Sequence, residues 1–133
     1  MKKLFVFLFI IQVSIILPQE VVIKSLKTYT SKDANSIPVL SSPRDLLTID
    51  FDVQTEFSPN INIIFKFCDK NWNPTDNLFL ANQGKNTAYT LNYFLLPTTV
   101  EEAKYHYTNT FPDKDGYVAF PYSGKWKFFV VDS

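Results

Sequence analysis

The sequence predicts an all-β fold, an antiparallel β-sandwich, and three observations support this prediction. Several stretches alternate apolar and polar residues with a period of two, which is typical of strands with one buried face. Turn-forming pairs such as Ser58-Pro59 and Asp115-Gly116 separate these stretches. The connections are too short for the helical crossovers that a parallel sheet needs. About seven short strands with turns between them indicate two packed antiparallel sheets.

The composition fits one domain that is stabilised by packing. The chain has 133 residues, with 13 Phe, 7 Tyr and 2 Trp against 3 Gly. Cys68 is the only cysteine, so no disulfide can form within the chain. The 13 basic and 13 acidic residues cancel, and this balance gives no reason to expect a nucleic-acid partner.

Residues 1–19 are predicted to be a signal peptide. Two lysines precede the apolar run Leu4–Leu17, and Pro18-Gln19 ends it. The run is shorter than the roughly 20 apolar residues of a membrane span. An uncleaved N-terminal anchor is the alternative. No cysteine follows the run for lipid attachment. We therefore expect an exported protein with one β-sandwich domain over residues 20–133.

Three stretches give the strongest strand predictions, at residues 46–53, 61–70 and 124–132. In each of them, every second residue is apolar, so one face is expected to lie in the core. The predicted core-facing residues are Leu47, Ile49, Phe51, Val53, Ile61, Ile63, Phe65, Phe67, Trp126, Phe128 and Val130.

The remaining elements have weaker patterns. Further strands are predicted at residues 20–29, 37–40, 87–94 and 103–111. Only residues 98–105 favour a helical turn or two, with Thr99 as a cap and Glu102 three residues later.

The last predicted strand runs toward a hairpin turn at Asp132-Ser133, where a partner strand is expected to follow. Three explanations are open: the chain is truncated, another chain supplies the strand, or residues 124–132 form a terminal edge. We favour truncation, because an aromatic edge strand without a partner is prone to aggregation.

Cys68 could be a nucleophile or a buried apolar side chain. A reactive thiol needs a base within hydrogen-bond reach, and His106 is the only histidine. A closed zinc site needs about four nitrogen or sulfur ligands, which the chain does not offer. We therefore predict that Cys68 is buried filler at a strand end.

Two polar segments have a structural and a functional interpretation. Trp72, followed by the turn-forming pair Asn73-Pro74, could stack on a sugar or a peptide, but we expect this segment to close the end of the core or to form a turn. Asp113-x-Asp115-Gly116 resembles the start of a calcium loop but lacks the distal acidic ligands, so a polar hairpin turn is expected.

The tyrosines are the clearest compositional sign of a binding role. Some of them are expected to line a contact face, because tyrosine suits interfaces. The six residues are Tyr89, Tyr93, Tyr105, Tyr107, Tyr117 and Tyr122. The sequence has no paired catalytic carboxylates, no phosphate-binding glycine loop and no nucleophile elbow. We expect no enzymatic activity, no cofactor and no small-molecule substrate.

Four short motifs occur in a distinctive order. An apolar strand ends in Cys68-Asp69, and Trp72-Asn73-Pro74 follows it. A later aromatic strand ends in Phe111-Pro112-Asp113, and Ser123-Gly124 opens the last strand. Over residues 21–131, this order resembles the N-terminal domain of the type IX secretion system plug protein family.

The resemblance implies an immunoglobulin-like sandwich that lacks its final strand or strands, as the first part of a longer envelope protein. It implies a periplasmic location at the outer membrane, where the family is thought to seal the periplasmic opening of a β-barrel translocon. It implies no catalytic residue. The motif residues are given a structural role: Cys68, Asp69, Trp72, Pro74, Phe111, Pro112, Ser123 and Gly124. A secreted β-sandwich module that binds glycan or protein is the alternative function.

Overall fold

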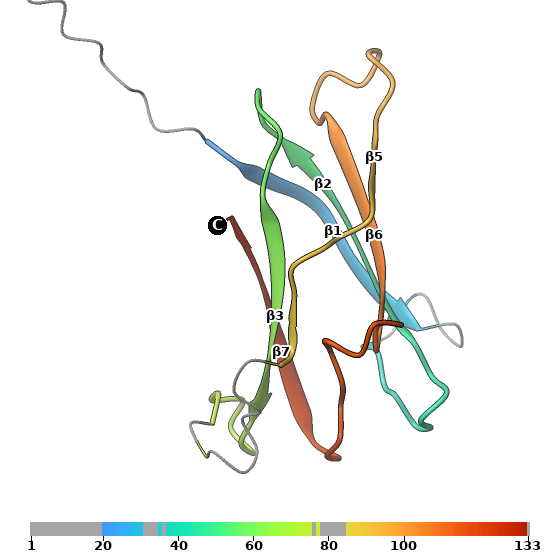
Figure 1. Ribbon diagram of the computed structural model, residues 1–133, viewed down its shortest axis with the longest axis vertical. Coiled ribbons are helices and arrows are strands. Elements are labelled where there is room, and N and C mark those ends of the chain that lie inside the picture. Colours follow the sequence, from blue (N-terminus) through green and yellow to red (C-terminus); the bar gives the residue numbers. More distant parts are fainter. Residues whose placement is uncertain (1–19, 31–34, 36, 76, 78–84, 133) are drawn as a thin grey trace, which may run out of the picture.

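The computed structural model describes residues 20–30, 35, 37–75, 77 and 85–132 (Figure 1). None of these residues lies in a helix, which confirms the all-β prediction. The predicted signal peptide, residues 1–19, and Ser133 of the predicted terminal turn lie outside the described residues. The strands are β1 (Val22–Thr30), β2 (Leu47–Gln54), β3 (Ile61–Cys68), β4 (Thr87–Ala88), β5 (Tyr93–Leu95), β6 (Tyr105–Phe111) and β7 (Lys125–Asp132).

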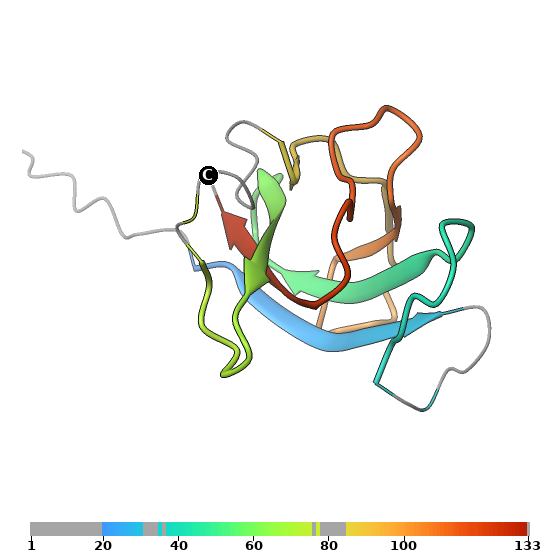
Figure 2. The same ribbon diagram turned by 90° about the horizontal axis from the view of Figure 1, so that it is seen from below.

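The strands form two antiparallel sheets, with the orders β1-β2-β6-β5 and β4-β3-β7. Side chains from both sheets share one hydrophobic core, so the two sheets pack face to face as a sandwich. Figure 2 looks along the long axis, and there the loop between β6 and β7 arches from one sheet to the other.

The alternation predicted for β2 and β7 is confirmed. Ile49, Phe51 and Val53 of β2 are completely buried. The Phe51 ring stacks on Tyr107, which lies opposite it in β6, with 4.9 Å between the ring centroids. In β7, the predicted inward residues, Trp126 among them, pack against the core. Each fully buried apolar side chain stabilises the fold by about 1.5–3 kcal/mol.

Strand β3 follows its predicted pattern at Ile61, Ile63 and Phe65, which are all buried. Phe67 on the same face is only partly buried, because it lies toward the end of the sandwich. Cys68 lies on the other face and is also buried, since the following turn folds back and Pro74 forms an isolated β-bridge with it.

Two weaker predictions are wrong. Residues 37–40 form no strand, because Pro38 cannot donate a ladder hydrogen bond and Pro43 soon bends the chain. Residues 98–105 form no helix. The Leu96 amide donates to the Lys104 carbonyl and extends the ladder of β5 and β6, so the intervening residues close a hairpin loop.

The predicted strand 87–94 is two short strands in different sheets. β4 pairs with β3 and β5 pairs with β6, so the chain crosses between the layers at residues 89–92. Asn109 of β6 fixes this crossing. Its side chain accepts a hydrogen bond from the Asn92 amide at 2.7 Å and donates to the Asn92 carbonyl at 3.1 Å.

The buried tyrosine Tyr107 makes stability sensitive to alkaline pH. Burial raises the pKa of Tyr107 to about 12, and the neighbouring Tyr93, Tyr105 and Asp132 add to the shift. The neutral phenol is thus favoured in the folded state. Its contribution is complete below pH 10 and is lost as the pH rises toward about 12.

We expect the free energy of unfolding to fall by about 2–3 kcal/mol over this range because of Tyr107. Urea unfolding at several alkaline pH values, followed by phenolate absorbance, measures the fall. The Tyr107→Phe protein is the control, and it should lose clearly less stability over the same range. An equal loss in this variant would contradict the assignment to Tyr107.

Candidate binding site

The motif residues predicted from the sequence come together at one end of the sandwich, which we call the motif end. It lies where β3 and β6 finish and where β7 begins (Figure 1). An open groove of about 780 Å³ lies at this end. Its lining includes four motif residues, Trp72, Pro112, Ser123 and Gly124. The other four, Cys68, Asp69, Pro74 and Phe111, lie in the adjoining turn and strand ends.

Asp69 organises the turn that follows β3. Its carboxylate accepts hydrogen bonds from the amides of Asn71 and Asn73 at 2.8 and 2.9 Å. Both hydrogen bonds lower the pKa of the Asp69 carboxyl, and the bond from the Asn73 amide contributes most. The backbone of Asp69 also bonds to Asn73 and Trp72 at 2.8 and 3.1 Å. The motif spacing from Cys68 to Pro74 is therefore the spacing of one hydrogen-bonded turn.

Trp72 lies on the surface, so the prediction that it closes the core is wrong, whereas the alternative that it belongs to a turn is confirmed. Its side chain is 44% exposed. The tight turn gives Trp72 a positive φ of 67°, which directs it away from the interior. The Lys125 ammonium lies 4.9 Å from the centroid of the Trp72 ring and donates to the Lys70 carbonyl at 2.7 Å. A cation–π contact thus holds the exposed ring in place.

Cys68 is buried, as predicted, with 3% of its surface exposed. The nearest hydrogen-bond partner of its thiol is the Lys66 carbonyl, at 3.6 Å. His106 lies in the other sheet, where its Nδ1 is 2.7 Å from a carboxylate oxygen of Asp52. The arrangement thus provides no thiol–imidazole pair. Among the described residues, no group of three His, Cys, Asp or Glu side chains could hold a metal ion.

Replacing Cys68 with serine is expected to lower the free energy of unfolding by about 1–2 kcal/mol, because a hydroxyl enters an apolar site. Binding at the motif end should be unchanged. Urea unfolding measures the first effect. A thiol reagent tests the burial directly, since it should modify Cys68 only after denaturant is added. Rapid labelling of the folded protein would contradict the buried position.

A chain of aromatic rings links the core to the motif end. Phe65 packs edge-on against Phe111 and Phe120, with centroids 4.8 and 5.3 Å apart. Phe120 contacts Trp126 at 5.2 Å. From Trp126 the contacts continue through Phe67 to Tyr122, at 5.2 and 6.3 Å. The exposed ring of Tyr122 is therefore supported from beneath by packed aromatic side chains.

The loop between β6 and β7 forms one wall of the groove and is tied to the rest of the fold. Asp113 accepts hydrogen bonds from the amides of Tyr117 and Val118. Asn86 bonds to Tyr117 through its backbone and to the amide of Ala119 through its side chain. The loop joins strands of different sheets, so the predicted hairpin is wrong. The Asp113 carboxylate shapes the loop by binding backbone amides.

The tyrosines separate into buried and exposed sets. Tyr105 and Tyr107 are buried in the core. The exposed set comprises Tyr89, Tyr93, Tyr117 and Tyr122. Of the exposed set, only Tyr122 lines the groove at the motif end. Lys125 and Phe120 also contribute to this end, although neither was predicted as a site residue. The sequence could have indicated them, because Lys125 directly follows Gly124 and Phe120 lies three positions before Ser123.

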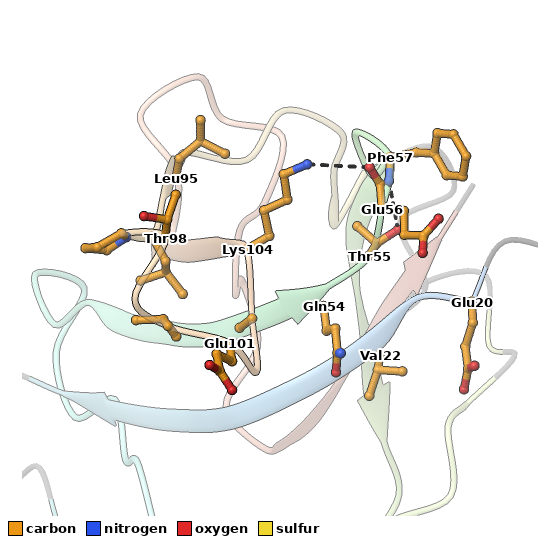
Figure 3. Close-up of a pocket in the computed structure, with 14 residues that line it drawn as sticks. Glu20, Val22, Gln54, Thr55, Glu56, Phe57, Leu95, Thr98, Glu101 and Lys104 are labelled. Carbon is orange, nitrogen blue, oxygen red and sulfur yellow. Dashed lines mark hydrogen bonds between the residues drawn. The ribbon is translucent and has the colours of Figure 1, made fainter.

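A second hollow lies at the opposite end of β2 and β6 (Figure 3). Glu20, Glu56 and Glu101 line it, and Lys104 reaches across to the Glu56 carbonyl at 3.5 Å. None of the predicted motif residues is part of it. We therefore take the groove at the motif end as the candidate site.

No protein-family model, curated protein or solved structure matches this chain. In the described part of the chain, no helix has the length and apolar character needed to cross a membrane.

Proposed function

We propose that this chain is a non-enzymatic, exported β-sandwich that docks on another protein through its motif end. The observation that carries the proposal is the exposure of two aromatic side chains, Trp72 and Tyr122, on a rigid support. Lys125 holds the first of them and the aromatic chain supports the second. Large, preorganised aromatic side chains are the usual anchors of protein interfaces, because they bury much area with little loss of entropy.

The partner follows from the motif resemblance. We propose the β-barrel translocon of the type IX secretion system in the outer membrane, with this domain on its periplasmic side. The mechanism is occlusion, in which a rigid domain covers the barrel opening and aromatic anchors supply the affinity. Without Lys2 and Lys3 of the predicted signal peptide, the domain has 13 − 2 = 11 basic and 13 acidic residues, and this small net charge fits a contact that is dominated by buried apolar area rather than by charge steering.

The immunoglobulin-like part of the proposal is supported by strand order. The sheets β1-β2-β6-β5 and β4-β3-β7 follow the order in which immunoglobulin-type sandwiches arrange their strands A-B-E-D and C′-C-F. This order is compatible with the domain type that the plug resemblance implies.

Co-purification from a type IX-secreting cell envelope tests the proposal. The tagged protein should retain a large outer-membrane barrel. The double substitution Trp72→Ala and Tyr122→Ala should weaken this binding by about 30-fold or more, the effect of losing interface anchors. Phe57→Ala is the matched control, because Phe57 is 60% exposed and lies beyond the other end of β3. Barrel capture that is unaffected by the double substitution would contradict docking through the motif end.

Binding to a glycan is the second candidate, and the exposed Trp72 ring favours it. A fixed indole at the edge of a groove is suited to stacking on a sugar face. A glycan array measures this activity. If the array shows binding that Trp72→Ala abolishes, and the barrel is not captured, the glycan function replaces the docking function.

A further inference from the structure

The outer edge of β5 combines unpaired backbone groups with exposed apolar side chains. β5 is the last strand of its sheet and lies beside β6 (Figure 1). The residues on both sides of it, 85–92 and 96–104, are described, and none of them pairs with its outer edge. All three β5 residues are exposed: Tyr93 by 49%, Phe94 by 52% and Leu95 by 62%. No other strand in the described part of the chain is exposed at every position.

The hydrogen bonds of the β5 segment show which backbone groups face outward. The Asn92 carbonyl accepts a hydrogen bond from β6 at 3.3 Å, and the Leu96 amide donates one to the residue before β6 at 2.9 Å. Hydrogen-bonded pairs alternate along an antiparallel ladder, so Phe94 forms the hydrogen-bonded pair between them. The amides and carbonyls of Tyr93 and Leu95 therefore point away from β6, toward the open edge.

This edge is self-complementary. When two β5 strands pair antiparallel about a two-fold axis at Phe94, Tyr93 of each copy lies opposite Leu95 of the other. These two pairs are hydrogen-bonded pairs, and they satisfy every outward amide and carbonyl of β5. Phe94 then faces Phe94 of the second copy in a non-hydrogen-bonded pair, where side chains approach most closely. Aromatic cross-strand pairs stabilise a sheet.

The distribution of charge also favours a second copy. Residues 86–100 contain no Asp, Glu, Lys, Arg or His, so two copies bring no like charges together along β5. A charged partner would find no opposite charge on this strand. The other edge of the same sheet is different, because β1 has a bulge between Lys24 and Lys27. A bulge and lysine side chains are devices that prevent edge pairing.

The exposed rings of β5 are already held in place. The Tyr93 ring contacts the rings of Tyr105 and Tyr107, with centroids 5.6 and 5.2 Å apart. The Phe94 ring lies 4.8 Å from the ring of His106, on the other face of the sheet. Association therefore needs little ordering of these side chains, which lowers its entropic cost.

We propose that two copies of this chain associate through their β5 strands, so that their four-stranded sheets form one continuous sheet. A large side chain has about 150–250 Å² of surface, so the three half-exposed side chains present roughly 300 Å² per copy. Two copies bury about 600 Å², which is less than the roughly 1,200 Å² of a stable interface. The dimer is therefore weak, with a Kd on the order of 100 µM. β5 does not line the groove at the motif end, so the inference is independent of the docking function.

Sedimentation equilibrium of the purified protein, from about 10 µM to about 1 mM, tests the proposal. The protein should pass from monomer to dimer over this range. Hydrogen exchange followed by NMR should show an alternating pattern in β5. The amides of Tyr93 and Leu95 should become protected as the concentration rises, whereas the amide of Phe94 should be protected throughout, because it faces β6.

A charge exchange at Phe94 tests the two-fold register. Phe94→Lys and Phe94→Glu should each weaken association at least about tenfold, because each variant places like charges opposite one another. An equimolar mixture of the two should associate about fivefold or more tightly than either alone. Both variants are expected to fold, since Phe94 is half-exposed, and circular dichroism checks this. Leu26→Lys is the matched control, because Leu26 is also half-exposed and lies on the edge strand β1, and it should leave association unchanged.

Three results would overturn the proposal. The first is a protein that stays monomeric at about 1 mM. The second is an equal effect of Phe94→Lys and Leu26→Lys, or a mixture of charge variants that does not associate. The third is protection that appears in β7 and not in β5. Trp72→Ala with Tyr122→Ala separates this proposal from the docking function, since it should weaken barrel capture and leave self-association within about twofold.

Discussion

Replacing Phe65 with alanine is expected to lower the free energy of unfolding by about 3–5 kcal/mol. Phe65 is 4% exposed and lies where the core meets the motif end. Its ring contacts Phe111, Phe120 and Phe128 with centroids 4.8–6.1 Å apart. Removing it would leave a cavity that these rings border on three sides. A loss of this size is a large part of the stability of an ordinary domain.

Urea unfolding followed by tryptophan fluorescence measures the effect of Phe65→Ala. Phe57→Ala is the matched control, because the same atoms are removed from a side chain that is 60% exposed, and it should change stability by no more than about 0.5 kcal/mol. Equal effects of the two substitutions would mean that Phe65 does not lie in the shared core.

Replacing Gly124 with alanine is expected to cost about 2–4 kcal/mol, for two separate reasons. Gly124 has a φ of 154°, which side-chain-bearing residues rarely adopt. A Cβ atom would also lie 2.6 Å from two ring atoms of Phe67. The Phe67 ring has little room to move, since it is held between Trp126 and Tyr122. The same change should displace Tyr122 and weaken docking at the motif end.

Two controls separate the causes at Gly124. Gly116 has a φ of 74°, but a Cβ atom added there would meet nothing within 4 Å, so Gly116→Ala should show only the backbone cost, about 1 kcal/mol. In a Phe67→Ala background, Gly124→Ala should cost less than it does alone, because the steric clash is gone. If the cost is the same in both backgrounds, the close approach to Phe67 does not contribute.

Local patterns predicted the long strands, because burial of one face imposes a period of two on the sequence. This holds for β2, where Ile49, Phe51 and Val53 are all fully buried. The crossing between β4 and β5 was not predicted, because it depends on Asn109, which is 17 positions away from Asn92. The predicted helix at 98–105 was wrong for a similar reason, since pairing between β5 and β6 decides the local conformation.

The candidate site was predicted in part. The motifs after β3 and before β7 were recognised, and the structure places them at one end of the sandwich. The exposure of Trp72 was missed, because a hydrophobicity argument assigns tryptophan to the core and does not include the backbone of the turn. The position of Lys66 directly opposite Lys127 was not predicted, because only the register of two distant strands reveals it.

The central claim is that the motif end is the docking surface, and site-specific photo-crosslinking in the cell envelope tests it most directly. A photoreactive amino acid is placed at the exposed Asn71, next to Trp72 in the same turn, or, in a second protein, at Phe57, so that it lies beyond one or the other end of β3 while the Trp72 anchor stays in place. The account predicts a crosslink to a large outer-membrane barrel from position 71 and none from position 57. A crosslink from position 57 alone, or from neither position, would contradict it.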